Sequence, residues 1–265
     1  MNSSEQKILT EVKRIRSKLR RPTVVALDGG SGAGKSTIAE RLMRLTDLAL
    51  VRLDDFYQTV IPESELPHKT VQQRLNGVFD WSRVRSEALE PLRAGKPGRW
   101  HAFDFQRGLG KAGTYSLKGQ ATEVASAPTI LVEGAYSASP PLRDLIDLAV
   151  LVDVRNQTRH LRTVARGENA EFLTEWHQIW DEVETYYFEH VCPPESFDLV
   201  ILNNDNADTI RSFAASLTLS VSQNHACHPS RKTAIAHEVA LGLTASLSSG
   251  ESTRAIRRPH LSNRR

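Results

Sequence analysis

The sequence of 265 residues predicts an α/β protein in which a parallel β-sheet is flanked by helices on both faces. Short apolar runs, several of them rich in β-branched residues, alternate along the chain with segments of helical periodicity. This alternation implies right-handed crossovers that connect parallel strands and place helices over the sheet. A glycine-rich turn that joins one apolar run directly to a helix supports the same interpretation. The length suits one domain with appendages, because domains usually hold about 100–200 residues.

Both kinds of element can be placed along the chain. The expected strands are short apolar runs of the kind that is buried in a parallel sheet, and they span residues 23–28, 49–53, 129–132, 148–154 and 199–202. Helical periodicity predicts helices at about residues 4–19, 36–43, 83–94, 156–166 and 172–190.

Two of the helices carry further signals. Ser82 is expected to cap the helix at 83–94, because Gly95 and Pro97 follow that helix in the usual order of start and stop signals. The last helix has a stripe of large side chains on one face, which indicates core packing: Trp176, Trp180, Val183 and Tyr187.

Composition excludes several classes of protein. Hydrophobic residues make up 40% and charged residues 25% of the chain, as in ordinary soluble proteins. No apolar run approaches the roughly 20 residues that span a bilayer, and the first residues lack the apolar block of a signal peptide. Only Cys192 and Cys227 are present, too few for a disulfide scaffold. A reducing, cytoplasmic setting without a membrane partner is therefore expected.

Charge divides the chain into three segments. Residues 1–22 and residues 221–265 each carry seven Lys and Arg against two Glu, a net charge of +5 for each segment. Since the whole chain carries +3, residues 23–220 carry −7. We expect a basic N-terminal helix in residues 1–22, the main domain in residues 23–220, and a basic, flexible tail in residues 221–265. Nucleic acid is not the expected partner, although a basic tail can contact a polyanion.

The strongest motif is the run from Gly29 to Ser36, which matches G-x-x-x-x-G-K-[ST] between a predicted strand and a predicted helix. Its glycines let the backbone curl so that successive N–H groups point at phosphate oxygens. Lys35 would neutralise charge on the β- and γ-phosphates, and the Ser36 hydroxyl would reach Mg²⁺. The alternative, a glycine-rich turn that merely contains a lysine, does not explain the flanking strand and helix. The residues expected to bind ATP are Gly29, Gly30, Ser31, Gly32, Ala33, Gly34, Lys35, Ser36 and Thr37.

Three carboxylates follow predicted strands. Asp54 and Asp55 come directly after the second strand, and Glu133 follows the third. Because ligands of an open parallel sheet bind outside the carboxyl ends of its strands, these acids share an edge with the phosphate loop. Phosphoryl transfer needs a base for the acceptor hydroxyl and acids that hold the metal. Such acids can also merely cap loops, but the set together with the phosphate loop favours a catalytic site.

Four motifs together resemble the uridine kinase and phosphoribulokinase family, and type I pantothenate kinases share their layout. The motifs are the phosphate loop, Leu53-Asp54-Asp55-Phe56-Tyr57, Phe79-Asp80 and Val132-Glu133-Gly134. The resemblance covers residues 24–202 and implies a P-loop NTPase fold with a small lid. It implies that Asp54 is the catalytic base and that Ser36 holds Mg²⁺, with Asp54 and Glu133 close by through water. It also implies that Asp80 binds acceptor hydroxyls and that Tyr57 lines the acceptor pocket.

The sequence departs from this family at two places. Uridine kinases carry Tyr-Asp-Phe and then a histidine that reads the base, whereas here Phe103-Asp104-Phe105-Gln106-Arg107 has no histidine after it. Phe103 is still expected to contact the acceptor, but uridine as the acceptor does not follow. Of the family's lid arginines, Arg162 and Arg166 are matched and later ones are missing. They share a helical face with Arg159, where a solvated basic face is the alternative to a role beside the acceptor. Arg166 is expected to stabilise charge on the transferring phosphoryl group.

The sequence therefore supports an enzyme that uses ATP and Mg²⁺ to phosphorylate a hydroxyl of a nucleoside, a sugar or a similar polyol. An alternative is a nucleotide-dependent regulatory ATPase or switch that acts on a macromolecular partner. A degenerate relative without turnover is a third interpretation, which the intact Lys35, Asp54 and Glu133 disfavour. The sequence leaves open the acceptor and whether the chain forms a homo-oligomer. The choice of Asp54 over Asp55 as the base rests on the resemblance alone.

Overall fold

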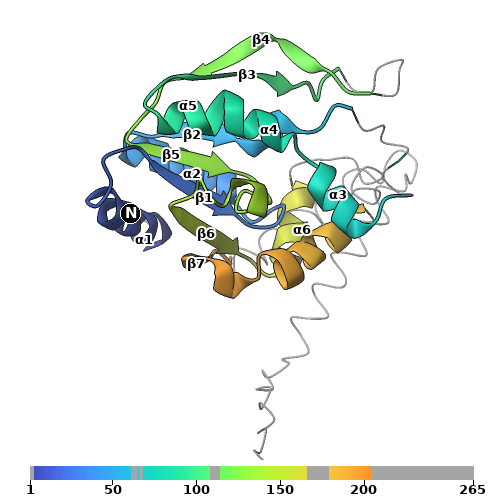
Figure 1. Cartoon of the computed structure of the whole chain (residues 1–265). Coiled ribbons are helices and arrows are strands. Elements are labelled where there is room, and N and C mark those ends of the chain that lie inside the picture. The colour runs from blue at the N-terminus through green and yellow to red at the C-terminus, as the bar shows by residue number, and fades with distance from the viewer. Residues whose placement is uncertain (1–2, 61–64, 66–67, 108–113, 166–178, 205–265) are drawn as a thin grey trace, which may run out of the picture. The chain divides into compact units, whose positions relative to one another are not determined.

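The computed structural model describes residues 3–60, 65, 68–107, 114–165 and 179–204 (Figure 1). The chain divides into two units after Asp205, and the description below concerns the first of them. The predicted tail at 221–265 and the predicted helix residues 166 and 172–178 lie outside the described ranges.

The centre of the fold is a five-stranded, all-parallel sheet with the strand order β2-β5-β1-β6-β7. Each strand coincides with a predicted one to within two residues: β1 Thr23–Asp28, β2 Ala49–Arg52, β5 Thr129–Glu133, β6 Leu148–Asp153 and β7 Leu199–Leu202. Glu133 at the end of β5 pairs with Leu27 of β1 on one side and with Arg52 of β2 on the other. Three strands therefore end at one edge, as the sequence predicted.

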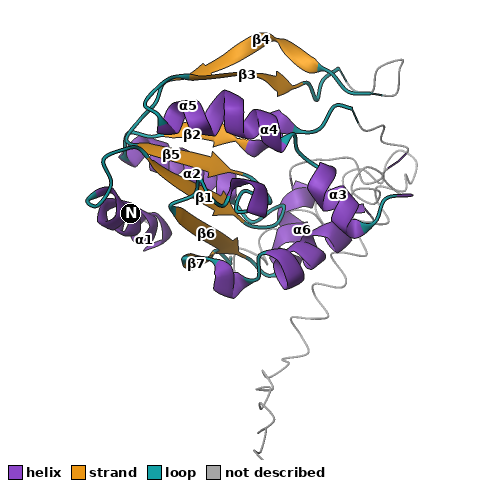
Figure 2. Ribbon diagram, viewed as in Figure 1, coloured by secondary structure: helices purple, strands orange, loops and turns teal. Residues whose placement is uncertain are grey.

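Helices cover both faces of this sheet (Figure 2). The bounds are α1 Ser3–Arg16, α2 Lys35–Leu45, α3 Val71–Gly77, α6 Asn156–Ala165, and a helix that runs through 179–186 into η5 Tyr187–Val191. The side chains of β1 alternate between two cores: Val25 and Leu27 pack with α1 and α2, whereas Val24 and Ala26 pack on the opposite face. Both cores are continuous with β5 and β6, so the predicted layer arrangement, a P-loop NTPase α/β fold, is confirmed.

The predicted cap of the helix at 83–94 was wrong. The helix is continuous through α4 Trp81–Arg83, η3 Val84–Leu89 and α5 Glu90–Arg93, and its cap is Asp80, whose Oδ1 accepts a hydrogen bond of 3.2 Å from Arg83 N–H. A cap accepts from the third helical residue, so the acid two residues before Ser82 takes that position. The predicted end was right: Gly95 follows with φ +76°, the left-handed conformation that ends many helices.

A hairpin and a short helix were missed from the sequence. Strands β3 Gly98–Phe103 and β4 Leu117–Val124 form an antiparallel pair that lies over the helix α4–α5 in Figure 1. β4 is largely exposed and has no alternating apolar pattern, so it gives little signal of a strand. Helix α3 begins with a capping box between Thr70 and Gln73, and this sequence pattern could have predicted the helix. Within the described ranges no helix combines the length and apolar character needed to cross a bilayer.

Candidate active site

The phosphate loop connects β1 to α2 and depends on glycine at its two ends. Gly29 and Gly34 have φ values of +146° and +90°, which residues that carry a Cβ atom rarely adopt. A Cβ atom at Gly29 would lie 2.5 Å from the Val152 carbonyl oxygen, and one at Gly34 would lie 2.7 Å from the Asn203 amide nitrogen. The backbone thus curls at the edge of the sheet, directly before the N-terminus of α2.

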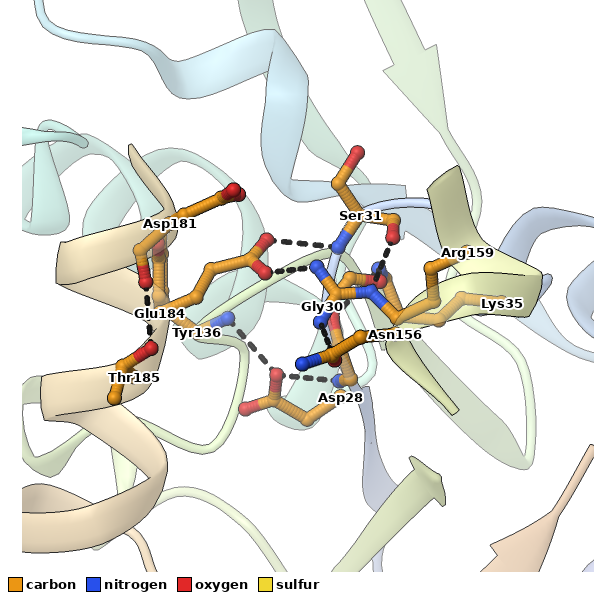
Figure 3. Close-up of polar contacts among 11 residues, drawn as sticks. Asp28, Gly30, Ser31, Lys35, Tyr136, Asn156, Arg159, Asp181, Glu184 and Thr185 are labelled. Carbon is orange, nitrogen blue, oxygen red and sulfur yellow. Dashed lines mark hydrogen bonds and ion pairs between the residues drawn. The ribbon is translucent and has the colours of Figure 1, made fainter. Parts of the chain in front are cut away.

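The start of the loop is anchored by Asp28, a fully buried carboxylate that the sequence interpretation did not single out. Its Oδ1 accepts from Gly29 N–H at 2.7 Å and Tyr136 N–H at 2.9 Å. Its Oδ2 accepts from Ala138 N–H at 2.9 Å and from the Tyr187 hydroxyl at 2.7 Å. Burial raises the pKa of Asp28, while the hydrogen bonds from Tyr187, Ala138 and Gly29 and the charge of Lys35 oppose the shift. Asp28 therefore ties the loop to Tyr136 in the segment after β5, as Figure 3 shows, and through Tyr187 to the helix that ends in η5.

Lys35 and Ser36 lie at the first turn of α2. The Lys35 ammonium is buried and donates to the carbonyl oxygens of Gly29 at 2.7 Å and Gly30 at 3.0 Å. The Ser36 hydroxyl donates to Glu133 Oε1 at 3.0 Å. Thr37 follows on the exposed side of the same turn. The turn thus places a cation and a hydroxyl beside the end of β5.

The two adjacent acids after β2 have different surroundings. They lie in the turn η1 Leu53–Phe56, where Asp54 lines a cavity that it shares with Glu133. Burial, and then the charge of Glu133, raise the pKa of Asp54 to about 6. Asp55 instead accepts a hydrogen bond of 2.8 Å from the Trp100 indole. The geometry therefore separates the pair: Asp54 faces the cavity, and Asp55 fastens the hairpin.

The cavity has a volume of about 300 Å³, within the range of small-molecule sites. One side is the phosphate loop and α2, and another is formed by the acids Asp54 and Glu133. The remaining wall includes four aromatic side chains, and it comprises Tyr57, Val78, Phe105, Gly134, Ala135, Tyr136, Thr163, Trp180 and Glu184. Tyr57 and Phe105 meet edge to face with their ring centroids 5.7 Å apart. Such a site suits a polyphosphate at one end and a partly apolar molecule at the other.

Eight of the sixteen predicted site residues line this cavity. Those that line it are Ser31, Gly32, Gly34, Lys35, Ser36, Asp54, Tyr57 and Glu133. Phe103 lies behind the lining, packed on Phe105 with a centroid distance of 4.7 Å. Asp80 is outside the lining and caps a helix. Arg162 donates to the loop carbonyls of Gly32 at 3.3 Å and Ala33 at 3.2 Å, and Arg166 lies outside the described residues.

The other eight lining residues were not predicted as site residues, and Tyr136, Trp180 and Glu184 are the most informative of them. Tyr136 has φ +66°, a conformation rare for a bulky residue, which the sequence cannot announce. Trp180 was assigned to core packing. Glu184 was detectable, because it lies four residues after Trp180 and three before Tyr187, so it is a charged residue on an otherwise apolar helix face.

The side-chain oxygen atoms at this edge of the sheet are suitable ligands for Mg²⁺. Ser36, Asp54 and Glu133 converge, and hydroxyl and carboxylate oxygens are the ligands that Mg²⁺ prefers. Burial of Asp54 next to the Glu133 charge is unfavourable for the ionised pair, and a divalent cation between them would relieve it. Among the described residues no group of three or more His, Cys, Asp or Glu could enclose a metal. The remaining ligands would be phosphate oxygens and water, as is usual for Mg²⁺ at phosphoryl-transfer sites.

Sequence comparisons find relatives that are named as uridine or uridine-cytidine kinases. The chain is 26% identical over 197 residues to uridine-cytidine kinase B of Dictyostelium discoideum, an alignment that covers 72% of this chain and 74% of that protein. It is 27% identical over 183 residues to the uridine kinase of Deinococcus deserti, with 65% of this chain and 79% of that protein covered.

Two further comparisons concern the fold and the family. The solved structure of YFH7 from Saccharomyces cerevisiae, a P-loop protein with a circular permutation, superposes with a TM-score of 0.52 at 11% identity. That alignment covers 76% of this chain and 99% of the other. The model of the phosphoribulokinase / uridine kinase family matches residues 24–193. This range includes every residue that lines the cavity. The chain therefore belongs to the phosphoribulokinase / uridine kinase family.

Proposed function

We propose that the chain is an ATP-dependent kinase that transfers the γ-phosphoryl group to a hydroxyl of a small molecule, a nucleoside or a sugar-like polyol. The observation that carries the proposal is the placement of Asp54 and Glu133 beside the phosphate loop, in one cavity whose wall includes aromatic side chains. A triphosphate site alone would fit many nucleotide-binding proteins. A carboxylate that lines a pocket for a second molecule, beside the phosphate loop, is what a kinase requires.

At the nucleotide end, the loop N–H groups and Lys35 would bind the phosphates, with α2 presenting its N-terminus to their charge. Ser36, Asp54 and Glu133 would hold Mg²⁺ together with phosphate oxygens and water. The bound ion would supply positive charge that offsets the negative charge of the phosphates. Lys35 now donates to two loop carbonyls, and it would exchange these for phosphate oxygens.

At the acceptor end, Asp54 would receive the proton of the reacting hydroxyl. The acceptor oxygen forms a bond to the γ-phosphorus as the bond to the β-phosphate oxygen breaks, so that ADP leaves and the proton stays on Asp54 until water removes it. A base works best when its pKa lies near the working pH. The pKa of about 6 keeps Asp54 mostly ionised at neutral pH and more basic than an ordinary aspartate.

The acceptor class follows from the wall of the cavity. Tyr57, Phe105, Tyr136 and Trp180 offer apolar faces, and carboxylates lie beside them. Aromatic faces bind a nucleobase or the apolar face of a sugar, and carboxylates accept hydrogen bonds from hydroxyl groups. The named relatives act on uridine and cytidine, which makes nucleosides the first class to test.

The test is ATP turnover with a panel of acceptors. Nucleosides including uridine and cytidine, pentoses, hexoses and pantothenate-like alcohols are each added with MgATP, and phosphorylated product is measured. We expect transfer to members of one class and little ATP hydrolysis without them. Hydrolysis that responds to no small hydroxyl compound but rises with a macromolecule would contradict the proposal and favour a nucleotide-dependent switch.

A further inference from the structure

Glu184 joins the helix at residues 179–186 to the phosphate loop (Figure 3). It lies on the helical segment 179–186, and its side chain is only 8% exposed. Its Oε1 accepts a hydrogen bond of 2.8 Å from Ser31 N–H, in the middle of the loop. Its Oε2 forms an ion pair with the Arg159 guanidinium. One buried carboxylate thus links three segments that are far apart in the sequence.

Arg159 of α6 completes the arrangement. Its Nε donates to the Ser31 carbonyl oxygen at 2.7 Å, so Ser31 is held through its N–H by Glu184 and through its carbonyl by Arg159. The guanidinium also packs on Gly30, where a Cβ atom would lie 2.4 Å from Arg159 Cζ. The pair therefore holds the loop backbone at residues 30 and 31.

The pair lies at the junction of the two halves of the cavity. Ser31 and Glu184 both line it, and so do Tyr57 and Tyr136 of the acceptor wall. Burial, and next the charge of Glu184, raise the pKa of Tyr136 well above its usual value, which places the carboxylate close to that wall. The phosphoryl group passes from the loop to the acceptor, so it crosses the cavity beside this pair.

The charges of the pair matter for the nucleotide. A buried carboxylate next to a phosphate site repels a triphosphate, and the Arg159 guanidinium compensates that charge. Ion pairs with little exposure are weak evidence for stability, because desolvation offsets most of the attraction. The position of the pair on the loop backbone accounts for it better than a stabilising role does.

We propose that Glu184 is a positioning residue for phosphoryl transfer: with Arg159 it forms an electrically neutral clamp that fixes the loop at Ser31 beside the transferred group. The inference rests on the proposed kinase function. Glu184 acts on the reaction through the Ser31 backbone, and Arg159 prevents its carboxylate from repelling ATP.

The clamp predicts different changes in kcat and in ATP affinity for three variants: Glu184→Gln, Arg159→Met and the double variant. Glu184→Gln keeps an oxygen for Ser31 N–H but loses the charge that holds Arg159, so kcat should fall about 10- to 100-fold, the value of one charge-assisted hydrogen bond. The KM for ATP should stay unchanged or fall, because a negative charge near the phosphates is gone. Arg159→Met leaves the carboxylate uncompensated, so ATP affinity should fall at least about tenfold. The double variant should bind ATP more tightly than Arg159→Met alone.

The measurements are kcat and KM with the best acceptor, and equilibrium binding of ATP to each variant. Glu182→Gln is the matched control, since Glu182 is on the same helix and pairs with an arginine, Arg74, outside the cavity lining. It should leave kcat and affinity unchanged. If Glu184→Gln loses its cooperative melting transition, Glu184→Asp replaces it; this variant keeps the charge but is too short for both contacts, and it should lower kcat without weakening ATP binding.

Two results would overturn the proposal. One is a wild-type kcat in the folded Glu184 variants, which would leave the pair a merely structural role. The other is a double variant that binds ATP no better than Arg159→Met, because then the carboxylate does not repel the nucleotide. If the wild-type chain transfers phosphate to no acceptor, the kinase proposal fails, and the two ATP-binding comparisons still decide whether the clamp exists.

Discussion

The indole nitrogen of Trp100 donates a hydrogen bond of 2.8 Å to Oδ2 of Asp55, and this bond separates two adjacent acids into two roles. Trp100 is a buried residue of β3, and the centroid of its ring lies 5.3 Å from that of Phe56. Asp55 therefore belongs to the contact between β3 and the turn after β2. Its neighbour Asp54 points into the cavity beside Glu133.

The change Asp55→Asn should leave kcat nearly unchanged and lower the stability of the fold. Asparagine can still accept the indole N–H through its amide oxygen, but the charge-assisted part of the bond is lost. We expect a loss of about 1 kcal/mol in the free energy of unfolding, measured by urea denaturation, with kcat within about threefold of the wild type. A loss of transfer comparable to that of an Asp54 variant would show that the base lies at Asp55.

The change Lys35→Ala should abolish transfer while the fold remains intact. Lys35 is the cation of the phosphate loop, and its present contacts are two loop carbonyls that water can replace. We expect ATP affinity to fall and turnover to become undetectable, with an unchanged circular dichroism spectrum. Undiminished turnover in this variant would contradict the assignment of the phosphate loop.

The change Tyr187→Phe should destabilise the protein through Asp28. The hydroxyl is one of four donors to this fully buried carboxylate, and its removal leaves part of the charge without a hydrogen bond. We expect a loss of about 1–3 kcal/mol in the free energy of unfolding. Tyr186→Phe on the same helix is the control, with an expected change below about 0.5 kcal/mol. Equal stability of the two variants would show that Asp28 is satisfied without Tyr187.

The change Asp54→Asn should stabilise the nucleotide-free protein at neutral pH. The pKa of about 6 in the folded state exceeds the value of about 3.9 in an unfolded chain, so the folded state alone holds this proton between those values. Stability therefore falls as the pH rises from about 4 to about 6 and stays lower above it. Asparagine removes this penalty, which solvent around the exposed Asp54 carboxylate keeps modest.

The gain should be visible in thermal melting at pH 8 without Mg²⁺ or nucleotide, and it should vanish toward pH 4. A melting difference that does not depend on pH would contradict the raised pKa of Asp54.

The sheet could be predicted from the sequence because its three central strands, β5, β1 and β6, are buried on both faces. Such strands are continuous apolar runs, as in Thr23–Asp28. The phosphate loop was predictable because its glycines are required by the local backbone geometry. Asp54 and Glu133 followed from one rule, that parallel strands end at a common edge.

The remaining parts of the site depend on contacts between distant segments. The bonds of Glu184 to Ser31 and of Tyr187 to Asp28 join residues that are more than 150 positions apart, and no local pattern encodes such a pairing. The hairpin was missed because β4 is a polar, exposed edge strand. Asp80 was expected at the acceptor from the resemblance, and its use as a helix cap became visible only with the backbone in place.

The most direct test of the account is the rate of γ-phosphoryl transfer from MgATP in Asp54→Asn, measured in a single turnover with the best acceptor and across pH. A positioned base contributes typically about 10²–10⁴-fold, so the variant should be slower by that factor at pH 7.5 while ATP affinity changes little. In the wild type the rate should fall as the pH drops through about 6, because Asp54 becomes protonated, and the variant should lack this dependence. A variant that transfers phosphate at the wild-type rate, with the same pH profile, would contradict the central claim that Asp54 is the base of a kinase.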